Sequence, residues 1–365
     1  MYIPYVGLKR QHQNLKEEIL DAVSKVLDES MFILGEDVKV FERKFEKYCN
    51  VKHAVGVNSG TDALFLSLRV LNIGVGDEVI TVPNSFLSTT STIVLVGAKP
   101  VFVDVKEDMN IDPELIEDKI TDKTKAILPV HLTGRPAEMD RIMEIAREHD
   151  LYVIEDCAQA IGAEYDGKKV GSFGDVNCFS LHPLKNLNAC GDGGVITTND
   201  DEIYEKLLQL RNIGLKDRDH ADIWGYNSRL DTIQAAICNV KFRYLEKWIE
   251  KRRENARYYN EELKEFVKVP VEGEKERCVY HTYIIQTELR DKLKQYLMEK
   301  GVETKIHYPI PIHLQKAARE LGYREGDFPM VERQAREILT LPVYPELTQE
   351  ELKYVADKIK EFFVK

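Results

Sequence analysis

The chain has 365 residues, and its 62 acidic and 51 basic side chains give a formal net charge of −11. Because no basic block stands out, we expect no nucleic-acid partner. The first thirty residues lack the apolar core of a signal peptide and no apolar run is long enough to span a membrane, so we expect a cytoplasmic protein.

Two helical patterns, roughly 11–29 and 36–48, open the chain, and short apolar runs then alternate with helices. The expected strands are HAVGV (53–57), EVITV (78–82), PVFVDV (100–105), KAILPV (125–130), LYVIED (151–156), VNCFSL (176–181) and GGVITT (193–198). Helices are expected between them at 59–71, 87–96, 113–119 and 137–149. Apolar strands separated by helices are typical of a parallel sheet covered on both faces.

The pattern changes after about residue 230. One long helical stretch over 231–266 precedes an expected strand, VYHTYIIQ (279–286), a helix at 289–299, a proline-rich loop and two more helices. The chain is longer than the size at which one hydrophobic core stops growing. We therefore predict a large domain over 1–230 and a smaller α+β domain over 231–365.

Cysteines and histidines give no sign of a metal site. No two of the six cysteines form a C-x-x-C pair; they are Cys49, Cys157, Cys178, Cys190, Cys238 and Cys278. We expect free thiols in a reducing cytosol. In the loop IHYPIPIH (306–313), two histidines lie six residues apart without a carboxylate or thiol nearby, so no metal is expected there either.

A first group of candidate residues is NSGT (58–61), between a strand and a helix. Ligands of open parallel sheets bind beyond the carboxyl ends of the strands. Gly60 allows a close backbone approach, and the unpaired N–H groups of the first helical turn attract an anion. The segment is therefore either a phosphate site or a simple helix cap through Ser59 or Thr61.

A second group is the carboxylate pair Glu155-Asp156, which ends another strand. A buried carboxylate costs free energy unless a cation or several hydrogen-bond donors meet it. Gln159 could add an amide to the same site. The alternative is an aspartate that caps the next segment. His131, after the strand KAILPV, either lines the site or is a structural histidine.

The third group lies in FSLHPLKNLNACGDGG (179–194), where Ser180 ends a strand and Lys185 follows five residues later. Desolvation can lower the pKa of a lysine to about 7–8, so that its amine can form a Schiff base. Taken alone, Lys185 could equally be an ordinary lysine beside a glycine turn.

Together the three groups indicate one chemistry. An anion site, a carboxylate that faces a ring nitrogen and a Schiff-base lysine are the protein's contribution to catalysis with pyridoxal 5′-phosphate. The carboxylate keeps the ring nitrogen protonated, so that the ring can accept electrons. Phe86, after a further strand end, could stack on the ring; the alternative is a core phenylalanine.

Segments from the N-terminal region nearly to the end of the chain carry a specific resemblance. They are FILGEDVKVFERKFEKYCNVKHAVGVNSGTDALFLSL, GDEVITVPNSF, GAKPVFVDV, VIEDCAQAIGA, GSFGDVNCFSLHPLKNLNACGDGG, GYNSRLDTIQAA and TKIHYPIPIHLQKAARELGYREGDFP. The sequence resembles the DegT/DnrJ/EryC1/StrS family of sugar aminotransferases. The resemblance implies an α/β protein of fold-type I (aspartate aminotransferase-like), with a large, mostly parallel sheet domain that binds the cofactor and a smaller C-terminal α+β domain.

The resemblance also implies roles for single residues around the cofactor ring. Lys185 would hold the cofactor as a Schiff base and later move the proton. Asp156 would pair with the pyridine nitrogen, and Gln159 would hydrogen-bond the ring hydroxyl. Phe86 would stack on the ring.

Further residues would bind the phosphate and the substrates. By the same resemblance, Gly60, Thr61 and Ser180 would bind the phosphate. Asn227 would reach the phosphate of a partner subunit, which implies a homodimer with shared active sites. Arg229 would bind the donor's carboxylate, because a guanidinium binds that group bidentately; the alternative is a structural salt bridge.

Three positions depart from the commonest family pattern. Ile161 stands where many relatives have histidine, Leu181 replaces a frequent aromatic residue, and Cys190 lies before GDGG. These differences leave the identity of the substrate undetermined, but they do not change the expected cofactor. Sugar dehydratases of the family carry histidine at the lysine position, so Lys185 argues against that branch.

The expected reaction moves an amino group from L-glutamate to a nucleotide-linked keto-sugar. The resemblance places His307 and Tyr308 at the acceptor sugar, and HYPxPxHLQ is more typical of relatives that aminate a 3-keto-hexose. The alternatives are a 4-keto nucleotide sugar, a keto-cyclitol, or a non-catalytic regulator that binds the cofactor. Intact Lys185, Asp156 and Gln159 argue against the regulator.

Overall fold

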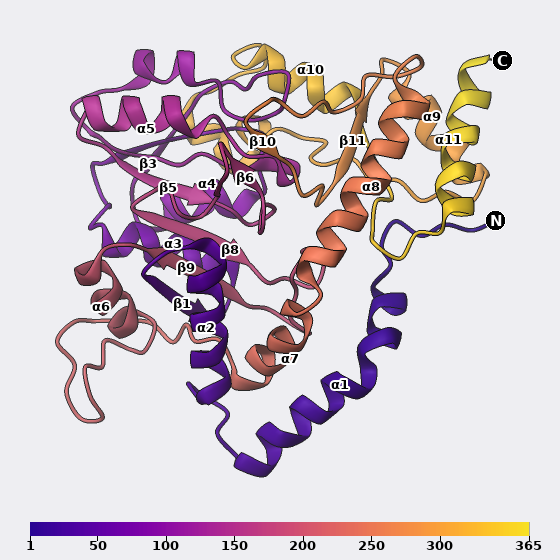
Figure 1. Ribbon diagram of the computed structural model, residues 1–365. Coiled ribbons are helices and arrows are strands. Elements are labelled where there is room, and N and C mark those ends of the chain that lie inside the picture. The colour runs from indigo at the N-terminus through magenta and orange to yellow at the C-terminus, as the bar shows by residue number, and fades with distance from the viewer. Residues whose placement is uncertain (365) are drawn as a thin grey trace.

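Figure 1 shows the computed structural model, which describes residues 1–364. One central sheet contains β1 (His53–Val57), β2 (Glu78–Thr81), β3 (Lys99–Phe102), β4 (Thr124–Ile127), β5 (Tyr152–Asp156), β8 (Val176–Ser180) and β9 (Gly194–Thr198). Their order is β1-β9-β8-β5-β4-β2-β3. The pairs β8–β5, β5–β4, β4–β2 and β2–β3 are parallel, so the carboxyl ends of these strands meet at one edge.

Strand β9 runs antiparallel to both of its neighbours, β1 and β8. The sequence predicted this strand but not its direction. A parallel return needs a crossover connection, usually through a helix. Residues 181–193 instead form a loop without a helix, and Ser180 pairs directly with Gly194 across its base. The loop leaves the sheet at the carboxyl end of β8 and carries Lys185.

The helices that cover the sheet pack against it through a face on which apolar side chains recur. On α5 (Met139–Glu148), the buried residues Met139, Ile142, Ile145 and Ala146 follow this spacing. Helices α3 (Gly60–Val70), α4 (Leu87–Leu95) and α6 (Asp201–Leu210) also pack on strands of the sheet. The burial of these faces, rather than helix propensity alone, stabilises helices of this length.

The helix predicted near 113–119 is wrong in type. The segment forms two 3₁₀ turns, Pro113–Leu115 and Glu117–Lys119. The side chain of Asp112 caps the first turn by accepting a hydrogen bond from the backbone N–H of Glu114 at 3.2 Å. The 3₁₀ helix is commonly used in short connecting pieces of this kind.

The long helix predicted after residue 230 is broken into α7 (Thr232–Phe242) and α8 (Leu245–Leu263). Between them, the N–H groups of Arg243 and Tyr244 bond to carbonyls three residues back, which tightens the last turn of α7. The two helices have different packing partners. Helix α7 contacts α1 (Leu8–Glu29) and α2 (Glu36–Cys49), whereas α8 contacts α11 (Gln349–Val364), so the chain must turn between them.

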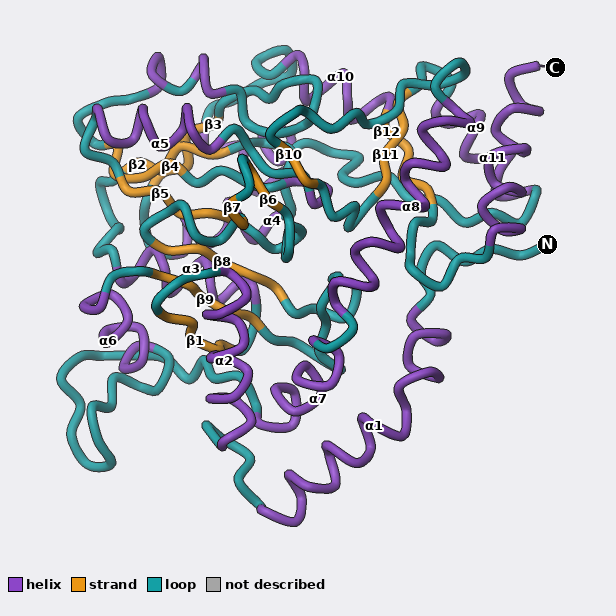
Figure 2. The backbone as a smooth tube through the Cα atoms, in the orientation of Figure 1, coloured by secondary structure: helices purple, strands orange, loops and turns teal. Residues whose placement is uncertain are grey.

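The C-terminal part has its own small sheet and its own apolar cluster. Strands β11 (Tyr283–Gln286) and β12 (Ile338–Leu341) pair antiparallel, and they are separate from the central sheet in Figure 2. Helices α9 (Arg290–Glu299) and α10 (Pro329–Glu337) belong to the same part of the chain. One buried cluster draws its members from residues 256–359 together with Ile3. The division into domains at residue 230 stays a prediction.

Three very short strands, β6 (Glu164–Tyr165), β7 (Lys168–Lys169) and β10 (Glu276–Arg277), form a third sheet. It joins the segment after β5 to the C-terminal part of the chain. None of the helices that the structure describes combines the length and the apolar composition that a membrane crossing requires.

Candidate active site

Lys185 lies half-buried in the loop after β8 and lines a cavity of about 60 Å³. Burial lowers its pKa from 10.5 to about 8, and the negative charge of Asp156 offsets part of this shift. Hydrogen bonds hold the loop, since Lys185 N–H donates to the His182 carbonyl at 2.8 Å and the Asn188 amide donates to the Lys185 carbonyl at 2.9 Å. The lysine is therefore positioned and more easily deprotonated than a surface lysine.

Asp156 ends β5 and is 4% exposed. Burial raises its pKa, while a hydrogen bond from Thr89 has the opposite effect. The Thr89 hydroxyl donates to Oδ2 at 2.8 Å, and the N–H of Ala158 donates to Oδ1 at 3.1 Å. Because the Thr89 proton is engaged there, the Ser85 hydroxyl donates to Thr89 Oγ1 at 2.8 Å. The carboxylate is thus held rigidly at the sheet edge.

Thr89 is a residue that the sequence reasoning missed. It lies on α4, three residues after Phe86, in a run of small hydroxyl side chains, LSTTST (87–92). Hydroxyls in a buried helix turn need partners, and this was the available signal. Nothing in the sequence, however, indicated that the partner is a carboxylate on β5.

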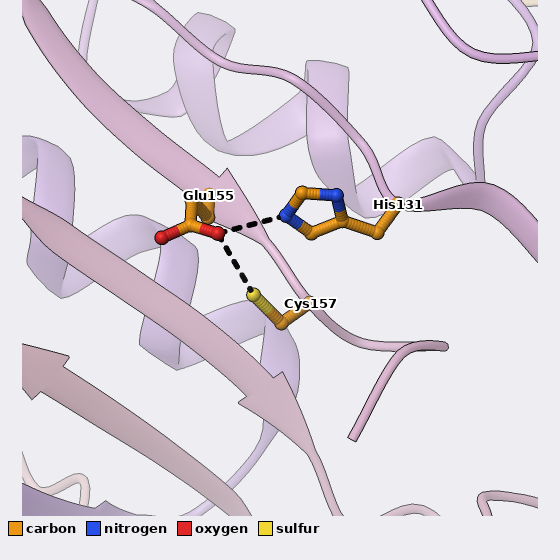
Figure 3. A group of neighbouring side chains, drawn as sticks. All are labelled: His131, Glu155 and Cys157. Carbon is orange, nitrogen blue, oxygen red and sulfur yellow. Dashed lines mark hydrogen bonds and ion pairs between the residues drawn. The ribbon is translucent and has the colours of Figure 1, made fainter. Parts of the chain in front are cut away.

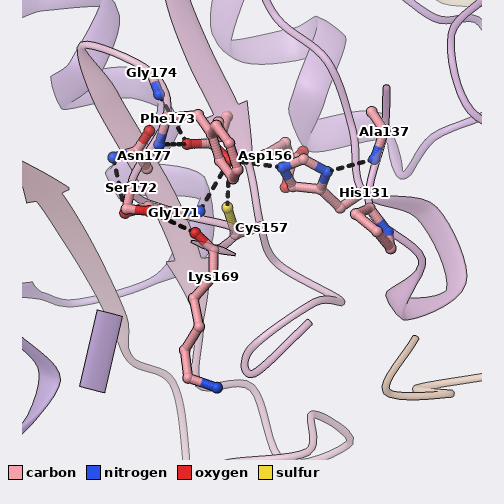
Figure 4. Close-up of polar contacts among 12 residues, drawn as sticks. His131, Ala137, Asp156, Cys157, Lys169, Gly171, Ser172, Phe173, Gly174 and Asn177 are labelled. Carbon is pink, nitrogen blue, oxygen red and sulfur yellow. Dashed lines mark hydrogen bonds and ion pairs between the residues drawn. The ribbon is translucent and has the colours of Figure 1, made fainter. Parts of the chain in front are cut away.

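Glu155 points to the opposite face of the sheet, as alternation along a strand requires. It is fully buried and accepts hydrogen bonds from the N–H groups of Gly171, Phe173 and Gly174 at 2.9, 2.7 and 2.9 Å. Figure 4 shows Gly171, Phe173 and Gly174 together in the turn that supplies these donors. Although burial alone would raise its pKa, the bond from His131 and these backbone donors hold it below its usual value. Glu155 therefore has a structural role, because its carboxylate holds this turn in place.

His131, Glu155 and Cys157 lie close enough together to suggest a metal site (Figure 3). The N–H of Ala137 donates to His131 Nδ1 at 2.9 Å, so the ring proton sits on Nε2 and is donated to Glu155 at 2.9 Å. Neither ring nitrogen keeps a free lone pair. Burial also raises the pKa of the Cys157 thiol well above its usual value. The group is a hydrogen-bonded cluster, and His131 is a structural histidine.

The N-terminus of α3 lies against the end of β8. A Cβ on Gly60 would lie 2.6 Å from Ser180 Cβ, so only glycine permits this approach. Ser59 caps the helix by accepting a hydrogen bond from Asp62 N–H at 3.0 Å. The hydroxyl of Thr61 is hydrogen-bonded to that of Ser88 at 2.8 Å. The cap and a phosphate site do not exclude each other, because the first-turn N–H groups of a helix have no partner within it.

Gln159, Phe86 and Tyr308 meet beside Asp156. Gln159 accepts a hydrogen bond from the Thr133 N–H at 2.8 Å and donates to the Tyr308 hydroxyl at 3.2 Å. The ring centroid of Phe86, which is 56% exposed, lies 6.1 Å from that of Tyr308. Phe86 is therefore not a core residue.

His307 lines the Lys185 cavity together with three residues that the sequence reasoning missed, Tyr5, Arg252 and His281. Burial lowers the pKa of His307 to about 4 and that of His281 well below its usual value, and the nearby Lys185 charge acts in the same direction. Both imidazoles are therefore neutral near pH 7. These residues come from four separate segments, so only the fold brings them together.

Asn227 and Arg229 are placed differently. Asn227 is exposed and bridges to Asn212, and Arg229 Nη1 donates to the side chain of Asn212 at 2.9 Å. Within residues 1–364, neither residue lines the Lys185 cavity. Their roles toward a partner subunit and a donor carboxylate stay predictions.

The site as a whole fits pyridoxal phosphate. Contacts of α4 with Thr61 and Asp156 tie the N-terminus of α3 to the end of β5, and Gly60 touches Ser180 on the strand before Lys185. An anion site, a buried carboxylate and an amine of lowered pKa thus lie at neighbouring strand ends. These are the groups that this cofactor needs for its phosphate, its ring nitrogen and its aldehyde.

Known proteins share this fold and are similar in sequence. The model of the DegT/DnrJ/EryC1/StrS aminotransferase family matches residues 13–360. The crystal structure of DesV from S. venezuelae, in complex with a ketimine intermediate, superposes with a TM-score of 0.98 at 40% identity, covering 100% of this chain and 99% of that one.

Two relatives are similar over their full length. The UDP-N-acetyl-3-dehydro-alpha-D-glucosamine 3-aminotransferase of Acidithiobacillus ferrooxidans is 44% identical, covering 98% of this chain and 97% of the relative. The "Pleiotropic regulatory protein" of Geobacillus stearothermophilus is 46% identical, covering 100% and 99%.

These findings confirm the predicted α/β fold of fold-type I and the predicted cofactor, whose amine form is bound in solved members of the family. They also confirm that the protein is an enzyme, an aminotransferase. The chain belongs to the DegT/DnrJ/EryC1/StrS aminotransferase family.

Proposed function

We propose that the protein transfers the amino group of L-glutamate to the keto group of a nucleotide-linked hexose. One observation carries the chemistry: the Lys185 amine, in the loop that follows β8, has a pKa near 8 and feels the charge of the buried Asp156 carboxylate at the end of the adjacent strand β5. When bound, pyridoxal phosphate supplies the electron sink and carries the amino group.

The chain's own residues orient the reacting groups and move protons. The neutral Lys185 amine would take a proton from the donor's α-carbon and deliver it to the cofactor carbon that receives the amino group. In the second half of a ping-pong cycle it would move a proton from that carbon to the former keto carbon of the sugar. Asp156, held by Thr89, would pair with the ring nitrogen of the cofactor. Gln159 would hydrogen-bond the ring hydroxyl, and Phe86 would stack on the ring. The neutral imidazole of His307 can contact sugar hydroxyls without adding charge.

We further propose a 3-keto acceptor. The Acidithiobacillus relative is named for a 3-dehydro sugar, and His307 and Tyr308 of the loop HYPxPxHLQ border the site. The test offers a panel of 3-keto and 4-keto nucleotide sugars and a keto-cyclitol to protein loaded with pyridoxamine phosphate. Return of the visible band of the lysine-bound cofactor identifies the acceptor. A return with 4-keto sugars alone would overturn the regiochemistry.

A regulatory role is the second candidate, and the name of the Geobacillus relative favours it. A regulator would not need the complete set of Lys185, Asp156 and Gln159 in bonded positions. Adding L-glutamate to the cofactor-loaded protein separates the two functions. An aminotransferase loses the visible band, whereas a non-catalytic regulator keeps it.

We propose a cytoplasmic homodimer with shared active sites. The loop after α6 carries Trp224, which is 94% exposed, next to the exposed Asn227. Aromatic residues are enriched at protein–protein interfaces, which supports a contact of this loop with a partner subunit. The six cysteines are free thiols, which suits a reducing compartment.

Shared sites predict complementation between two inactive variants. Lys185→Ala and Asn227→Ala homodimers each carry one defect in every site, but a mixed dimer carries one intact site. Random reassociation should therefore restore about a quarter of the wild-type sites, because half of the dimers are mixed. Assaying the two variants before and after co-refolding checks this. Unchanged activity after mixing would place Asn227 in its own subunit's site or outside any site.

The lowered pKa of Lys185 predicts the pH dependence of cofactor uptake. Only the neutral amine attacks the aldehyde, so uptake by cofactor-free protein should rise about tenfold per pH unit at low pH. It should level off near pH 8, where burial places the pKa, instead of near 10.5. Stopped-flow absorbance from pH 6 to 10 measures this, and a rate still rising beyond pH 9.5 contradicts it. In Asp156→Asn, which lacks the charge that raises this pKa, the plateau should begin at lower pH.

A further inference from the structure

A buried arginine of α8, Arg252, lines the Lys185 cavity and is only 9% exposed. Its Nη1 donates to the backbone carbonyls of Tyr280 and His281 at 3.2 and 3.3 Å. Its Nε is buried without a hydrogen-bond partner. The guanidinium is thus held at one end by these two hydrogen bonds, while its Nε–H has no acceptor among the described residues.

The charge of Arg252 lacks an ion-pair partner. Among residues 1–364, three arginines are buried; Arg211 pairs with Glu42 at 2.5 Å and Arg290 with Asp291 at 2.6 Å, but no carboxylate pairs with Arg252. Burial lowers the pKa of Arg252 to about 10, because the protein interior disfavours the charged form of the guanidinium. A buried cation without a partner costs free energy, and an anionic ligand would offset that cost.

In the part of the chain that the structure describes, Glu346 is the one carboxylate that lines the same cavity. Burial raises its pKa, and Arg252 acts on it only through space, without an ion pair. Burial lowers the pKa values of His281 and His307, and the positive charge of Lys185 acts in the same direction, so both imidazoles are neutral near pH 7. Arg252 is therefore a buried cation of this cavity with which a small anion can pair.

Arg229, to which the sequence assigned the donor's carboxylate, is in a different position. Its guanidinium bonds to Asn212, and it does not line the cavity of Lys185. Within the single chain, Arg252 is the arginine that shares a cavity with the reactive lysine. The planar fork of a guanidinium matches a carboxylate in a way that an ammonium does not.

We propose that Arg252 binds a carboxylate of the amino donor and so orients the donor's amine toward Lys185. This inference rests on the proposed aminotransferase function and names the residue that recognises the donor as an amino acid. The ligand class is an amino acid or its 2-oxo acid, and the unreactive dicarboxylate glutarate presents the same group. A hexose acceptor without a carboxylate does not need Arg252.

The test compares cofactor-loaded wild type with Arg252→Gln, Arg252→Lys and Arg229→Gln, the variant of the competing candidate arginine. Calorimetry measures the binding of glutarate, and band loss measures the reaction with L-glutamate and with propylamine, an amine without a carboxylate. Charge-assisted hydrogen bonds of this kind predict about 10- to 100-fold weaker glutarate and glutamate binding in Arg252→Gln, with part restored in Arg252→Lys. Propylamine should react alike in all four proteins.

The outcomes separate recognition from a structural role. Equal glutarate binding by wild type and Arg252→Gln, or a loss confined to Arg229→Gln, overturns the inference. Parallel losses for glutarate and propylamine also overturn it, because they indicate a distorted site. Should Arg252→Gln not fold, Arg252→Lys carries the same comparison. If wild type binds glutarate through Arg252 but glutamate never removes the band, the proposed function fails while the carboxylate site stands.

Discussion

Replacing Lys185 by alanine is expected to reduce transamination by about 10⁴-fold or more and to abolish the visible band of the lysine-bound cofactor. The residue is the amine that captures the cofactor and the base that moves the proton. Its pKa of about 8 supplies neutral amine near physiological pH, and no other lysine lines its cavity among the described residues. Single-turnover absorbance with L-glutamate measures both effects.

The remaining site should survive this substitution. Gly60, Thr61, Ser180 and Asp156 keep their contacts in Lys185→Ala, so the variant should still bind pyridoxamine phosphate, which needs no covalent bond. Lys353→Ala is the matched control: its exposed ammonium lies 4.0 Å from the partly exposed Asp357 on α11, and activity should not change. A Lys185→Ala protein that turns over glutamate at the wild-type rate would falsify the assignment of the lysine.

Most of the fold could be predicted from the sequence because its signals are local. Apolar runs and capping residues marked the strands of the central sheet and most helices within a few residues. The direction of β9 and the break before α8 depend on which elements pack together, and local patterns do not contain that information. The mistaken helix at 113–119 shows the same limit, since a single turn can be α or 3₁₀.

The location of Asp156 at the end of a strand and of Lys185 in the loop after the adjacent strand could be predicted, because each follows an apolar run in the sequence. The pair Glu155-Asp156 shows why the rest of the site could not. Adjacent strand residues point to opposite faces, so one carboxylate must face the site and the other must not. Only the partners, Thr89 for Asp156 and His131 for Glu155, decide which is which. Nothing in the sequence indicated Arg252, because what distinguishes this arginine among the described residues is that it is buried without an ion-pair partner.

Replacing Glu155 by alanine is expected to destabilise the protein by about 3–5 kcal/mol. The substitution removes the acceptor of three backbone N–H groups and of the His131 ring, in a place with no solvent access. Urea unfolding of wild type and variant measures the difference. The matched control is Glu144→Ala, since Glu144 pairs with Arg141 on the surface of α5 and its loss should cost under about 1 kcal/mol.

The pH dependence of this stability has a definite sign. The folded-state pKa of Glu155 lies below its ordinary value of 4.5, so its contribution is complete above about pH 4.5 and is lost as the pH falls through the folded-state pKa. Glu155→Gln should therefore be less stable than wild type at pH 7, and the gap should narrow in acid. A gap that stays constant down to pH 3 would mean that the carboxylate's charge contributes nothing. The same buried acceptor also fixes the end of β5, so Glu155→Gln should weaken cofactor binding through a displaced Asp156 even under conditions where the protein remains folded.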